Sequence, residues 1–459
     1  MNRREFIKKS TTLALGTSAA LSLEGCKNQE NNEELEQKKS QAKWYNWSKS
    51  LEANPKYIQV PKDEKELISV MQKASQVRFM GTSHSYMPLV PTEDTMVSLA
   101  YFNQVSKAEE PLMAYVGPGI VLSSMNRKLE EFGQDYISMP GVNQQTFGGA
   151  MSTGTHGTGK DLMALHAYIK QIKLITANGE TVVCSKDKES EIFESAKVSL
   201  GLLGAITEVK VQNRESFNMK QTIKMETLEW FLENGEKLFE TTECFECLYI
   251  PNTGKVVMIS SQQWDGEIHP KTHSNDEENI QTLKLLRDTL SWSPYLRRKL
   301  FDWFTSMNNV EEELYDRSFR ILCHHMVTKV NESEYHVPLE NGISCFGEVC
   351  ALMDTFPTAF FFLEIRRVKG DDAYMSPFYQ RDSYSVSVHS PVEKNPIDLT
   401  PFGAIYRKHK GRPHWGKWHD YSREEIEAAY PKMQNFLDVR KMLDPKGKLL
   451  NDYTRKMFV

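Results

Sequence analysis

Apolar residues in the first half of the chain recur at helical spacing in some segments and at alternate positions in others. Apolar side chains from Leu67 to Ala74 are three or four residues apart, which predicts a helix over 64–74. Asp63 stands at its start with Glu66 three residues later, as in a capping box. This segment therefore carries both the period and the start signal of a surface helix.

Further segments alternate between the two periods. Gly133 suits the end of a helix, and Asn178-Gly179 favours a two-residue hairpin turn. The predicted elements are a strand over 78–80, a strand and turn over 116–119, a helix over 123–132, a hairpin over 172–183 and a strand over 205–211. This order predicts an α+β fold class.

Two segments of the second half place polar side chains at alternate positions. From Ala359 onward, Glu364 and Arg366 share one strand face with Phe360 and Phe362. In the second segment the positions on one face are Ser383, Ser385, Ser387 and His389. Such faces suit a ligand rich in hydroxyl groups, but an antiparallel sheet with one face in water gives the same alternation.

The region between these halves carries less information. Residues 265–315 are charged and helical in pattern. They either cap a substrate site or form a solvated surface insertion, and the pattern does not choose between the two.

Length and charge narrow the class of protein. A chain of 459 residues exceeds one comfortable core, so two domains are expected. The net charge is −5, and it becomes −7 without the +2 carried by residues 1–25. This balance argues against nucleic acid as a partner and predicts no basic footprint.

The N-terminus resembles an export address. Residues 3–8 (RREFIK) are typical of a twin-arginine signal, residues 11–23 are too short to span a bilayer, and a lipoprotein-like box ends at Cys26. Residues 27–43 are polar and predict a flexible tether. We expect residues 1–26 to be an export signal. The mature protein would then be extracytoplasmic (periplasmic) and anchored to the membrane as a lipoprotein, with its lipid on Cys26. The alternative is a frayed basic terminus with a chance cysteine.

Cysteine and histidine spacing gives only weak signals for metal. Cys244 and Cys247 have the CxxC spacing, but no second CxxC or histidine pair follows at finger-like spacing. The favoured interpretation is two cysteines in a strand. A zinc hydrolase using His324 and His325 has no HExxH or comparable spacing behind it, so no metal is expected.

Two glycine-rich loops are the strongest indication of a ligand-binding site in the sequence. Residues 81–85 read GTSHS and residues 148–159 read GGAMSTGTHGTG. Glycines allow backbone N–H groups to approach a pyrophosphate closely. Each loop alone could be an ordinary turn, but two within one α+β segment indicate a dinucleotide site. The G-x-G-x-x-G fingerprint does not follow a first strand, which disfavours an NAD enzyme.

These loops, the GRPHWGK sequence at 411–417 and the segment 444–453 resemble the vanillyl-alcohol-oxidase superfamily, in particular its aldonolactone and alditol oxidases (D-arabinono-1,4-lactone oxidase-like, L-gulonolactone oxidase-like). The resemblance extends from Trp47 to Phe458. It implies a two-subdomain FAD-binding domain of the PCMH/VAO type over 44–214. It also implies an antiparallel-sheet substrate or cap domain with helices over 215–420 and a C-terminal segment, 421–459, that returns to the FAD domain.

The resemblance implies FAD as the cofactor. His84 matches the histidine that often bonds covalently to the 8-methyl carbon of the flavin, with non-covalent FAD as the alternative. His156 is expected to order the second loop and not to act as a base. The candidate cofactor-binding residues are Gly81, Thr82, Ser83, His84, Ser85, Gly141, Gly148, Gly149, Ser152, Thr153, Gly154, Thr155, His156, Gly157 and Ile206.

Four residues match the catalytic positions of the family: Glu364 and Arg366 its E-x-R pair, His389 its strand histidine and Lys417 its site lysine. The resemblance implies oxidation of a CH–OH group of a sugar lactone or alditol, with hydride passing to flavin N5. Lys417 and Arg366 would stabilise the developing alkoxide. Glu364 would orient Arg366, and His389 would hydrogen-bond the hydroxyl or take its proton.

The electron acceptor stays open in the sequence. We expect O2 as acceptor, giving H2O2. Met151 and Ser152 stand where relatives vary, in a loop that influences oxygen access, so a dehydrogenase with another acceptor is the alternative. A third possibility is a lipid-anchored flavin-binding protein without turnover.

Overall fold

A computed structural model describes residues 43–270, 276–307, 311–323, 326–392 and 396–459. The chain divides into two compact units, Met1–Lys38 and Lys39–Val459, and all described residues belong to the second. The expected signal over 1–26, the tether up to residue 42 and the pair His324 and His325 lie outside the described residues. No helix within the described ranges has the length and apolar character needed to cross a membrane.

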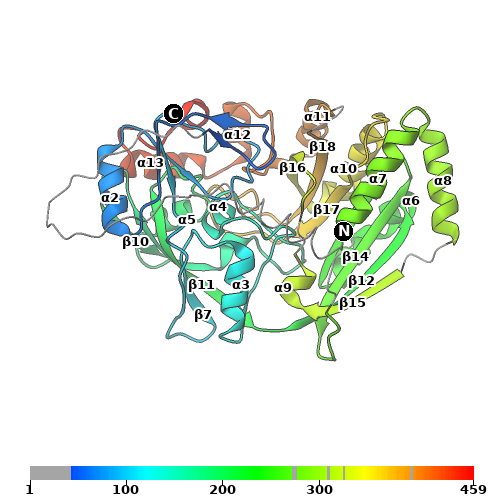
Figure 1. Ribbon diagram of the computed structural model, residues 1–459, viewed down its shortest axis with the longest axis horizontal. Coiled ribbons are helices and arrows are strands. Elements are labelled where there is room, and N and C mark those ends of the chain that lie inside the picture. Colours follow the sequence, from blue (N-terminus) through cyan, green and yellow to red (C-terminus); the bar gives the residue numbers. More distant parts are fainter. Residues whose placement is uncertain (1–42, 271–275, 308–310, 324–325, 393–395) are drawn as a thin grey trace, which may run out of the picture. The chain divides into compact units, whose positions relative to one another are not determined.

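The N-terminal half of the described chain is built on two main sheets (Figure 1). One contains three parallel strands in the order β3-β5-β4 (Tyr57–Gln59, Thr95–Ser98 and Val77–Met80). The other runs β10-β9-β11-β7-β6, with β8 also pairing with β11. Its strands are Thr181–Ser185, Ile169–Ile175, Ala205–Glu215, Met113–Val116, Val105–Lys107 and Gln134–Tyr136. A short pair, β1 (Trp44–Tyr45) and β2 (Glu52–Ala53), precedes them.

The local signals of this half are confirmed. Helix α2 (Glu64–Lys73) begins at Asp63, whose carboxylate accepts the Glu66 N–H. Helix α3 (Leu122–Glu130) is followed by Gly133 at φ +70°. Strands β9 and β10 form the predicted hairpin, with Gly179 at φ +87°. The remaining helical elements are η1 (Leu165–Tyr168), α4 (Phe147–Ser152) and α5 (Ser190–Ala196).

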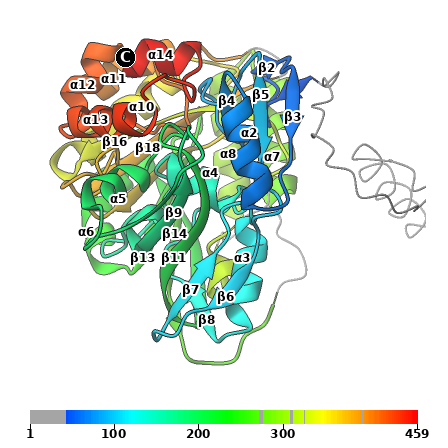
Figure 2. The ribbon, with the colours of Figure 1, turned by 90° about the vertical axis from the view of Figure 1, so that its left-hand side faces the viewer.

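The second half is built on an eight-stranded antiparallel sheet in the order β15-β12-β14-β13-β17-β18-β16-β19. Its strands are Glu311–Arg317, Asn218–Thr227, Lys255–Trp264, Cys244–Ile250, Leu363–Val368, Ser383–Pro391, Val330–Pro338 and Arg412–Pro413. Figure 2 shows this half behind the sheets of the first half. The expected combination of an α+β FAD domain with an antiparallel-sheet domain is therefore observed.

The central strands of this sheet are buried on both faces. Tyr335, Ile365 and Val386 alternate with polar neighbours and join the main hydrophobic core. Helices α6 (Leu228–Thr241) and α10 (Leu339–Met353) contribute Phe231, Phe346 and other side chains to the same core. The opposite strand positions hold serine, histidine, glutamate and arginine. Because these are also buried, the interpretation of the alternation as a water-facing sheet is wrong.

Two expectations about secondary structure need correction. The strand expected from Ala359 begins only at Leu363 in β17. Within the region expected to be helical, α7 (Asp276–Leu290) and α8 (Pro294–Met307) are helices, but residues 311–315 belong to strand β15. There Glu311, Glu312 and Glu313 lie in register with Lys224, Ile223 and Thr222 of β12, so tertiary pairing overrides the helical composition.

The last helices are α11 (Thr400–Lys408), α12 (Arg423–Ala429), α13 (Met433–Leu443) and α14 (Asp452–Phe458). Helix α9 (Ser318–Ile321) follows β15. The final segment contacts the first sheet: Leu449 packs with Leu67 and Val77, and Asn451 donates to the Pro88 and Pro91 carbonyls. Both CxxC cysteines lie buried and free in β13, as the strand interpretation predicts.

Candidate active site

A cavity of about 310 Å³ lies between the two glycine-rich loops. Both predicted loops supply its wall, together with Ile206 of β11 and residues of the H-W-G-K turn. The predicted cofactor residues on its lining are Gly81, Thr82, Ser83, His84, Ser85, Gly148, Gly149, Ser152, Thr153, Thr155 and Ile206. Residues more than a hundred positions apart thus meet at one cavity.

The first loop is held in a narrow set of conformations. A Cβ on Gly81 would come within 2.1 Å of Thr146 Oγ1, so only glycine fits between the loops there. Ser83 adopts φ +65°, and its hydroxyl accepts a hydrogen bond from Trp44 Nε1 at 3.0 Å. The backbone carbonyl of Ser83 accepts from Trp47 N–H at 2.7 Å. Residues 44–47 therefore brace the loop from outside the cavity.

His84 is the titratable side chain of this loop. Its ring stacks on Trp47 with centroids 5.4 Å apart, and Nδ1 lies 3.2 Å from Thr82 Oγ1. Nε2 is buried and makes no hydrogen bond. Burial, aided by the nearby Lys417 charge, lowers the pKa of His84 to about 4. The imidazole is therefore neutral at physiological pH and has a lone pair available for bonding.

The second loop approaches the backbone of its neighbours closely. A Cβ on Gly148 would lie 2.7 Å from Pro118 Cβ, and one on Gly157 would lie 2.3 Å from the Met139 carbonyl oxygen. Ser152 shares a hydrogen bond of 3.2 Å with Ser199. The glycines therefore let the chain pass beside the cavity without a side chain filling it. This cradle fits a dinucleotide pyrophosphate, as the motif predicts.

The H-W-G-K turn connects this cradle to the substrate sheet. Tyr86 N–H donates to the Gly416 carbonyl at 2.7 Å, which fixes the turn against the first loop. On the other side, His414 N–H and Trp418 N–H donate to the carbonyls of Glu334 and Glu332. His414, Gly416 and Lys417 all line the cavity as a result.

Beyond the turn, three adjacent strands carry one continuous polar face. Register places Glu334 opposite Ser387, which in turn lies opposite Glu364. In the next row His336 and Arg366 lie on either side of Ser385. All of these side chains are buried or nearly so. The face is therefore a dense polar layer inside the protein.

One half of this layer centres on Arg366. Its guanidinium contacts Glu334 at 2.8 Å and Glu364 at 3.2 Å. Burial penalises the charge of Glu334, but His156 and Arg366 outweigh that penalty and hold its pKa well below the usual range. Burial raises the pKa of Glu364 to about 8, against the opposing charge of Arg366 and with help from Glu246. One carboxylate and one neutral carboxyl thus flank the same cation.

The other half centres on Glu332. Its carboxylate accepts a hydrogen bond from Lys417 Nζ and lies 3.7 Å from His389 Nε2. His389 Nδ1 donates to the Phe362 carbonyl at 2.8 Å, which leaves Nε2 facing the carboxylate. Burial lowers the pKa of His389, with Lys417 adding to that effect and Glu332 opposing it. Lys417 is the member of this set that reaches the cavity wall.

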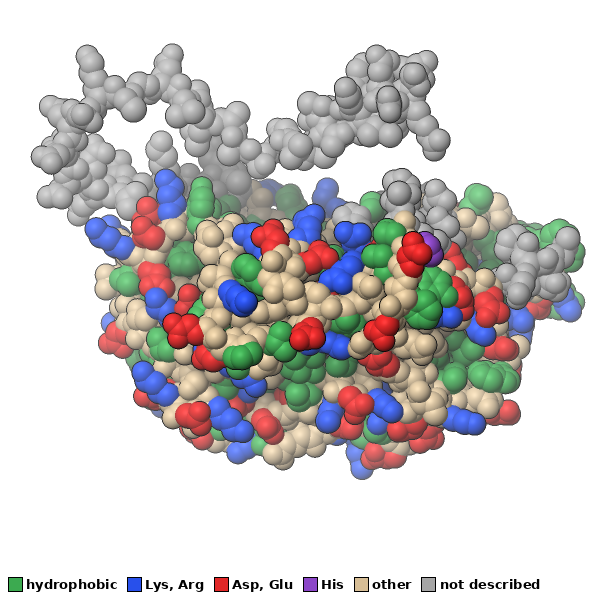
Figure 3. All heavy atoms as spheres, turned by 90° about the horizontal axis from the view of Figure 1, so that it is seen from below, with side chains coloured by type: hydrophobic (Ala, Val, Ile, Leu, Met, Phe, Trp, Pro, Cys, Tyr) green, Lys and Arg blue, Asp and Glu red, His purple; other side chains and the backbone are tan. Residues whose placement is uncertain are grey.

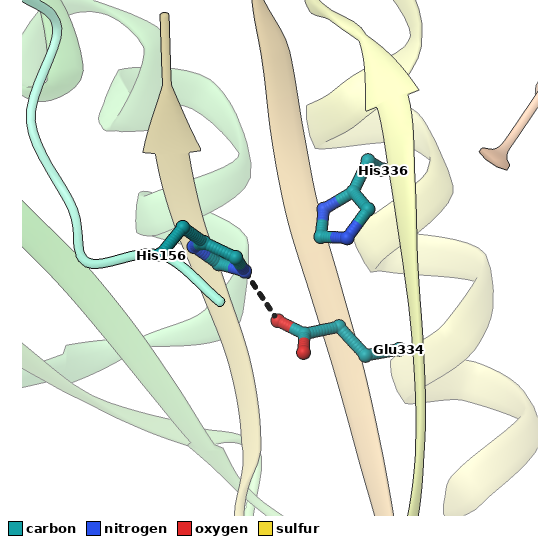
Figure 4. A group of neighbouring side chains, drawn as sticks. All are labelled: His156, Glu334 and His336. Atoms are coloured by element: carbon teal, nitrogen blue, oxygen red, sulfur yellow. Dashed lines mark hydrogen bonds and ion pairs between the residues drawn. The ribbon is translucent and has the colours of Figure 1, made fainter. Parts of the chain in front are cut away.

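His156, Glu334 and His336 together have the side chains of a metal site (Figure 4). Their donor atoms lie within 4.8 Å of one another, and His156 Nε2 is 3.1 Å from Glu334 Oε1. That same oxygen, however, is 2.8 Å from the Arg366 guanidinium and accepts the Ser385 hydroxyl. A metal ion would have to displace this cation or bind close beside it, at a high electrostatic cost. We therefore assign the cluster to the Arg366 network.

The structure divides the predicted residues into two groups. The four catalytic candidates all lie in the polar layer or at its edge. Glu364 contacts Arg366 directly, whereas His389 and Lys417 meet through Glu332. Gly141 and Gly157 line a separate small cavity beside Arg366. Gly154, at φ +83°, and His156 lie outside both cavity linings, and His156 contacts Glu334 from the end of the second loop.

Strand β16, which carries the two central glutamates of this network, is not predicted by the sequence analysis. Residues 330–338 read VNESEYHVP, with Glu332, Glu334 and His336 at alternate positions. Residues 383–389 show the same alternation, from which a polar strand face is predicted. The sequence of residues 330–338 therefore carries the same indication of a polar strand face. What the sequence did not contain was the pairing of this strand with β18.

Comparisons with known proteins agree with this architecture. The FAD binding domain family matches residues 55–185, and the D-arabinono-1,4-lactone oxidase family matches residues 209–457. L-gulonolactone oxidase of Mus musculus is 28% identical over 90% of this chain and 97% of its own length. L-gulono-1,4-lactone dehydrogenase of Mycobacterium tuberculosis is also 28% identical, over 90% of this chain and 98% of its own.

A solved structure shows the same fold. Cholesterol oxidase from B. sterolicum aligns with a TM-score of 0.69 at 14% identity, covering 91% of this chain and 96% of that protein. This likeness extends across both halves of the described chain. Taken with the cavity between two glycine-rich loops, the family matches lead to one conclusion: the chain belongs to the D-arabinono-1,4-lactone oxidase family of FAD-dependent oxidoreductases.

Proposed function

We propose that this protein oxidises a CH–OH group of a sugar lactone or a related alditol, with FAD bound between the glycine-rich loops. The single observation that carries the proposal is the position of Lys417. It lines the FAD-type cavity and at the same time bonds Glu332 of the polar layer. A substrate hydroxyl at that junction would meet both the cofactor site and the charged groups that can bind it. The relatives named as lactone oxidases and a lactone dehydrogenase support this substrate class.

FAD, when bound, would accept two electrons from the substrate carbon in the form of a hydride. The residues of the chain would handle charge and position. The ammonium of Lys417 stabilises negative charge that develops on the substrate oxygen. His389 is neutral, and its Nε2 beside Glu332 can receive the hydroxyl proton. Arg366 donates to substrate oxygens while Glu334 and Glu364 fix its orientation.

We propose that the FAD is covalently attached through His84. The supporting observations are the neutral imidazole, the buried Nε2 without a hydrogen bond and the place of the ring on the cavity wall. Stacking on Trp47 and contact with Thr82 keep the ring in one orientation. A covalent bond would keep the cofactor in place if the protein is exported.

We propose O2 as the electron acceptor, which would make H2O2 the second product. Ser152 lines the cavity and Met151 is fully buried, so Ser152 is the member of this pair that an acceptor entering the cavity would meet. The relatives with the same identity to this chain include one named oxidase and one named dehydrogenase. A dehydrogenase that uses another acceptor is therefore the second candidate.

We also propose export by the twin-arginine route and lipid attachment at Cys26, which rest on the sequence of residues 1–26. Mass spectrometry of the mature protein from membranes tests this directly. A mature N-terminus at a diacylated Cys26 is the expected result. An intact Met1 in the soluble fraction would reject it.

One experiment tests the reaction. Anaerobic addition of sugar lactones and alditols to the purified yellow protein should bleach the flavin absorbance with at least one compound. Air should then restore the colour with formation of H2O2. Bleaching that only an artificial acceptor reverses would establish the dehydrogenase. No bleaching with any lactone or alditol would exclude both enzymes.

A further inference from the structure

The α7–α8 hairpin exposes an unusual number of large apolar side chains. We call this surface the hairpin patch and define it by Leu285, Trp292, Tyr295, Leu296, Leu300 and Trp303. Their exposed fractions range from 42% for Leu296 to 73% for Trp292. Figure 3 shows hydrophobic side chains gathered at the end of the molecule where α8 lies. Such a cluster on a water-soluble protein marks an interaction surface.

Helix α8 has its polarity reversed. Tyr295, Leu296, Leu300 and Trp303 are spaced so that they share one side of the helix, and that side faces outward. Arg297 points the other way: it is 2% exposed and donates to the Pro357 and Ala359 carbonyls. A helix that packs on a protein core normally shows the opposite arrangement. Its outward side therefore fits an apolar environment.

We propose that the hairpin patch docks the protein on an anionic lipid bilayer. Aromatic side chains such as Trp292 and Tyr295 favour the membrane–water interface, where the ring is apolar and its polar edge meets water. Exposed Arg298 and Lys299 flank these rings, and Lys299 Nζ lies 5.8 Å from the centre of the Tyr295 ring. Long basic side chains can extend from such a surface to phosphate headgroups.

The same charges argue against a second copy of this chain as the occupant. In a twofold dimer the two copies of the patch would enclose Arg298 and Lys299 of both chains at one apolar contact. Asp302 of the same helix is already paired with Lys255. Positive charges buried in this way carry a large desolvation and repulsion cost. Anionic headgroups would neutralise them instead. The composition of the patch therefore favours lipid over self-association.

The test must separate the patch from the proposed lipid anchor. We would use the full chain with Cys26→Ser, which cannot be lipidated, in flotation with vesicles of phosphatidylglycerol mixed with phosphatidylethanolamine. This protein should float with the vesicles, and Tyr295→Ser/Leu300→Ser should weaken its partitioning by roughly tenfold or more. Arg298→Glu/Lys299→Glu should lose most binding to the anionic vesicles. Tyr101→Ser/Met442→Ser, which alters exposed residues outside the hairpin, is the matched control and should bind normally.

Each other outcome has a defined meaning. Absence of binding by the Cys26→Ser protein, or equal binding by the patch and control variants, would overturn the proposal. A dimer in sedimentation equilibrium that the patch variant dissociates would assign the surface to a second copy and reject the bilayer. Flavin bleaching by substrate, measured on the same variants, reports separately on the proposed reaction and shows that each variant is folded.

Discussion

Two regions of this molecule reverse the usual placement of polar and apolar groups. The inner face of the eight-stranded sheet buries glutamates, an arginine and histidines, with Glu334 and His336 almost without exposure. Helix α8 exposes Tyr295 and Leu300 and buries Arg297. Each reversal costs free energy unless a partner compensates it.

The compensation differs between the two regions. In the sheet it is internal, because Arg366 neutralises Glu334 and Lys417 neutralises Glu332 within the fold. On α8 the inward Arg297 donates to two backbone carbonyls, but the outward Tyr295 and Leu300 remain 68% and 45% exposed. The first region therefore indicates a site for a small polar ligand, whereas the second indicates an external surface.

Lys417→Ala should have the largest effect on turnover. It therefore gives the sharpest test of whether the polar layer, and not the α8 surface, is the site of the reaction. Removing the only cavity-lining member of the Glu332 pair should reduce kcat/KM by about 10²–10⁴-fold while the bound flavin keeps its visible spectrum. Steady-state peroxide production and anaerobic flavin bleaching would measure it. The variant Tyr295→Ser/Leu300→Ser is the outer-region control and should turn over normally. Unchanged turnover with every lactone and alditol would remove Lys417 from the mechanism.

Glu334 provides the second test, because it holds Arg366 and His156 at once. Glu334→Ala leaves the buried guanidinium with only Glu364, which should lower the free energy of unfolding by about 3–5 kcal/mol. Turnover should also fall, by roughly 10²-fold, since Arg366 loses its orientation. Glu334→Gln keeps the hydrogen bonds without the charge and should recover much of the stability. If thermal melts and kinetics of the alanine variant matched wild type, the network would not position Arg366.

The features of the fold and site that the sequence predicts correctly depend on residues that are neighbours in the chain. The glycine-rich loops and the H-W-G-K turn are local motifs, and the cavity forms where those motifs meet. Capping at Asp63 and the turn at Gly179 likewise depend on neighbours in sequence, and both are confirmed. Local signals of this kind survive folding because the groups that interact are already close along the chain.

The features that the sequence does not predict depend on contacts between residues that are distant in the chain. Glu332 and Glu334 lie at the centre of the polar layer only because β16 pairs with β18, some fifty residues later, and β18 pairs with β17. Strand β15 forms from a glutamate-rich segment because β12 supplies lysines across from it. Neither pairing can be read from a single segment, since the alternation of β16 is equally compatible with a strand in water. For β16 the missing information was burial. For β15 it was the pairing with β12, since Glu311, Glu312 and Glu313 are exposed.

His84→Ala should have a smaller effect on turnover but a distinct chemical result. Without the ring nitrogen, acid precipitation should release the flavin into the supernatant, whereas wild type should keep it in the pellet. Turnover should fall by about tenfold or less, because the polar layer around Arg366 remains intact. His269→Ala, a histidine outside the cavity lining, is the matched control. Release of flavin from both wild type and variant would reject the covalent bond.

The pH dependence of stability should show the smallest effect and tests the neutral carboxyl in the polar layer. Burial raises the pKa of Glu364 from 4.5 to about 8, so between those values the folded protein holds a proton that the unfolded chain has lost. Wherever the folded state binds more protons, the free energy of unfolding decreases as pH rises. The contribution of Glu364 is therefore greatest at or below pH 4.5 and is lost progressively up to about pH 8.

Glu364→Gln should remove this contribution, so the free energy of unfolding of wild type minus that of the variant should decrease between pH 4.5 and about pH 8. Urea unfolding of both proteins across this range measures it. The buried histidines give slopes of the opposite sign, but they are common to both proteins and cancel in the difference. A difference that grows with pH instead would mean that Glu364 is ionised in the fold. Arg366 would then be neutralised by two carboxylates, and the polar layer would carry one more negative charge.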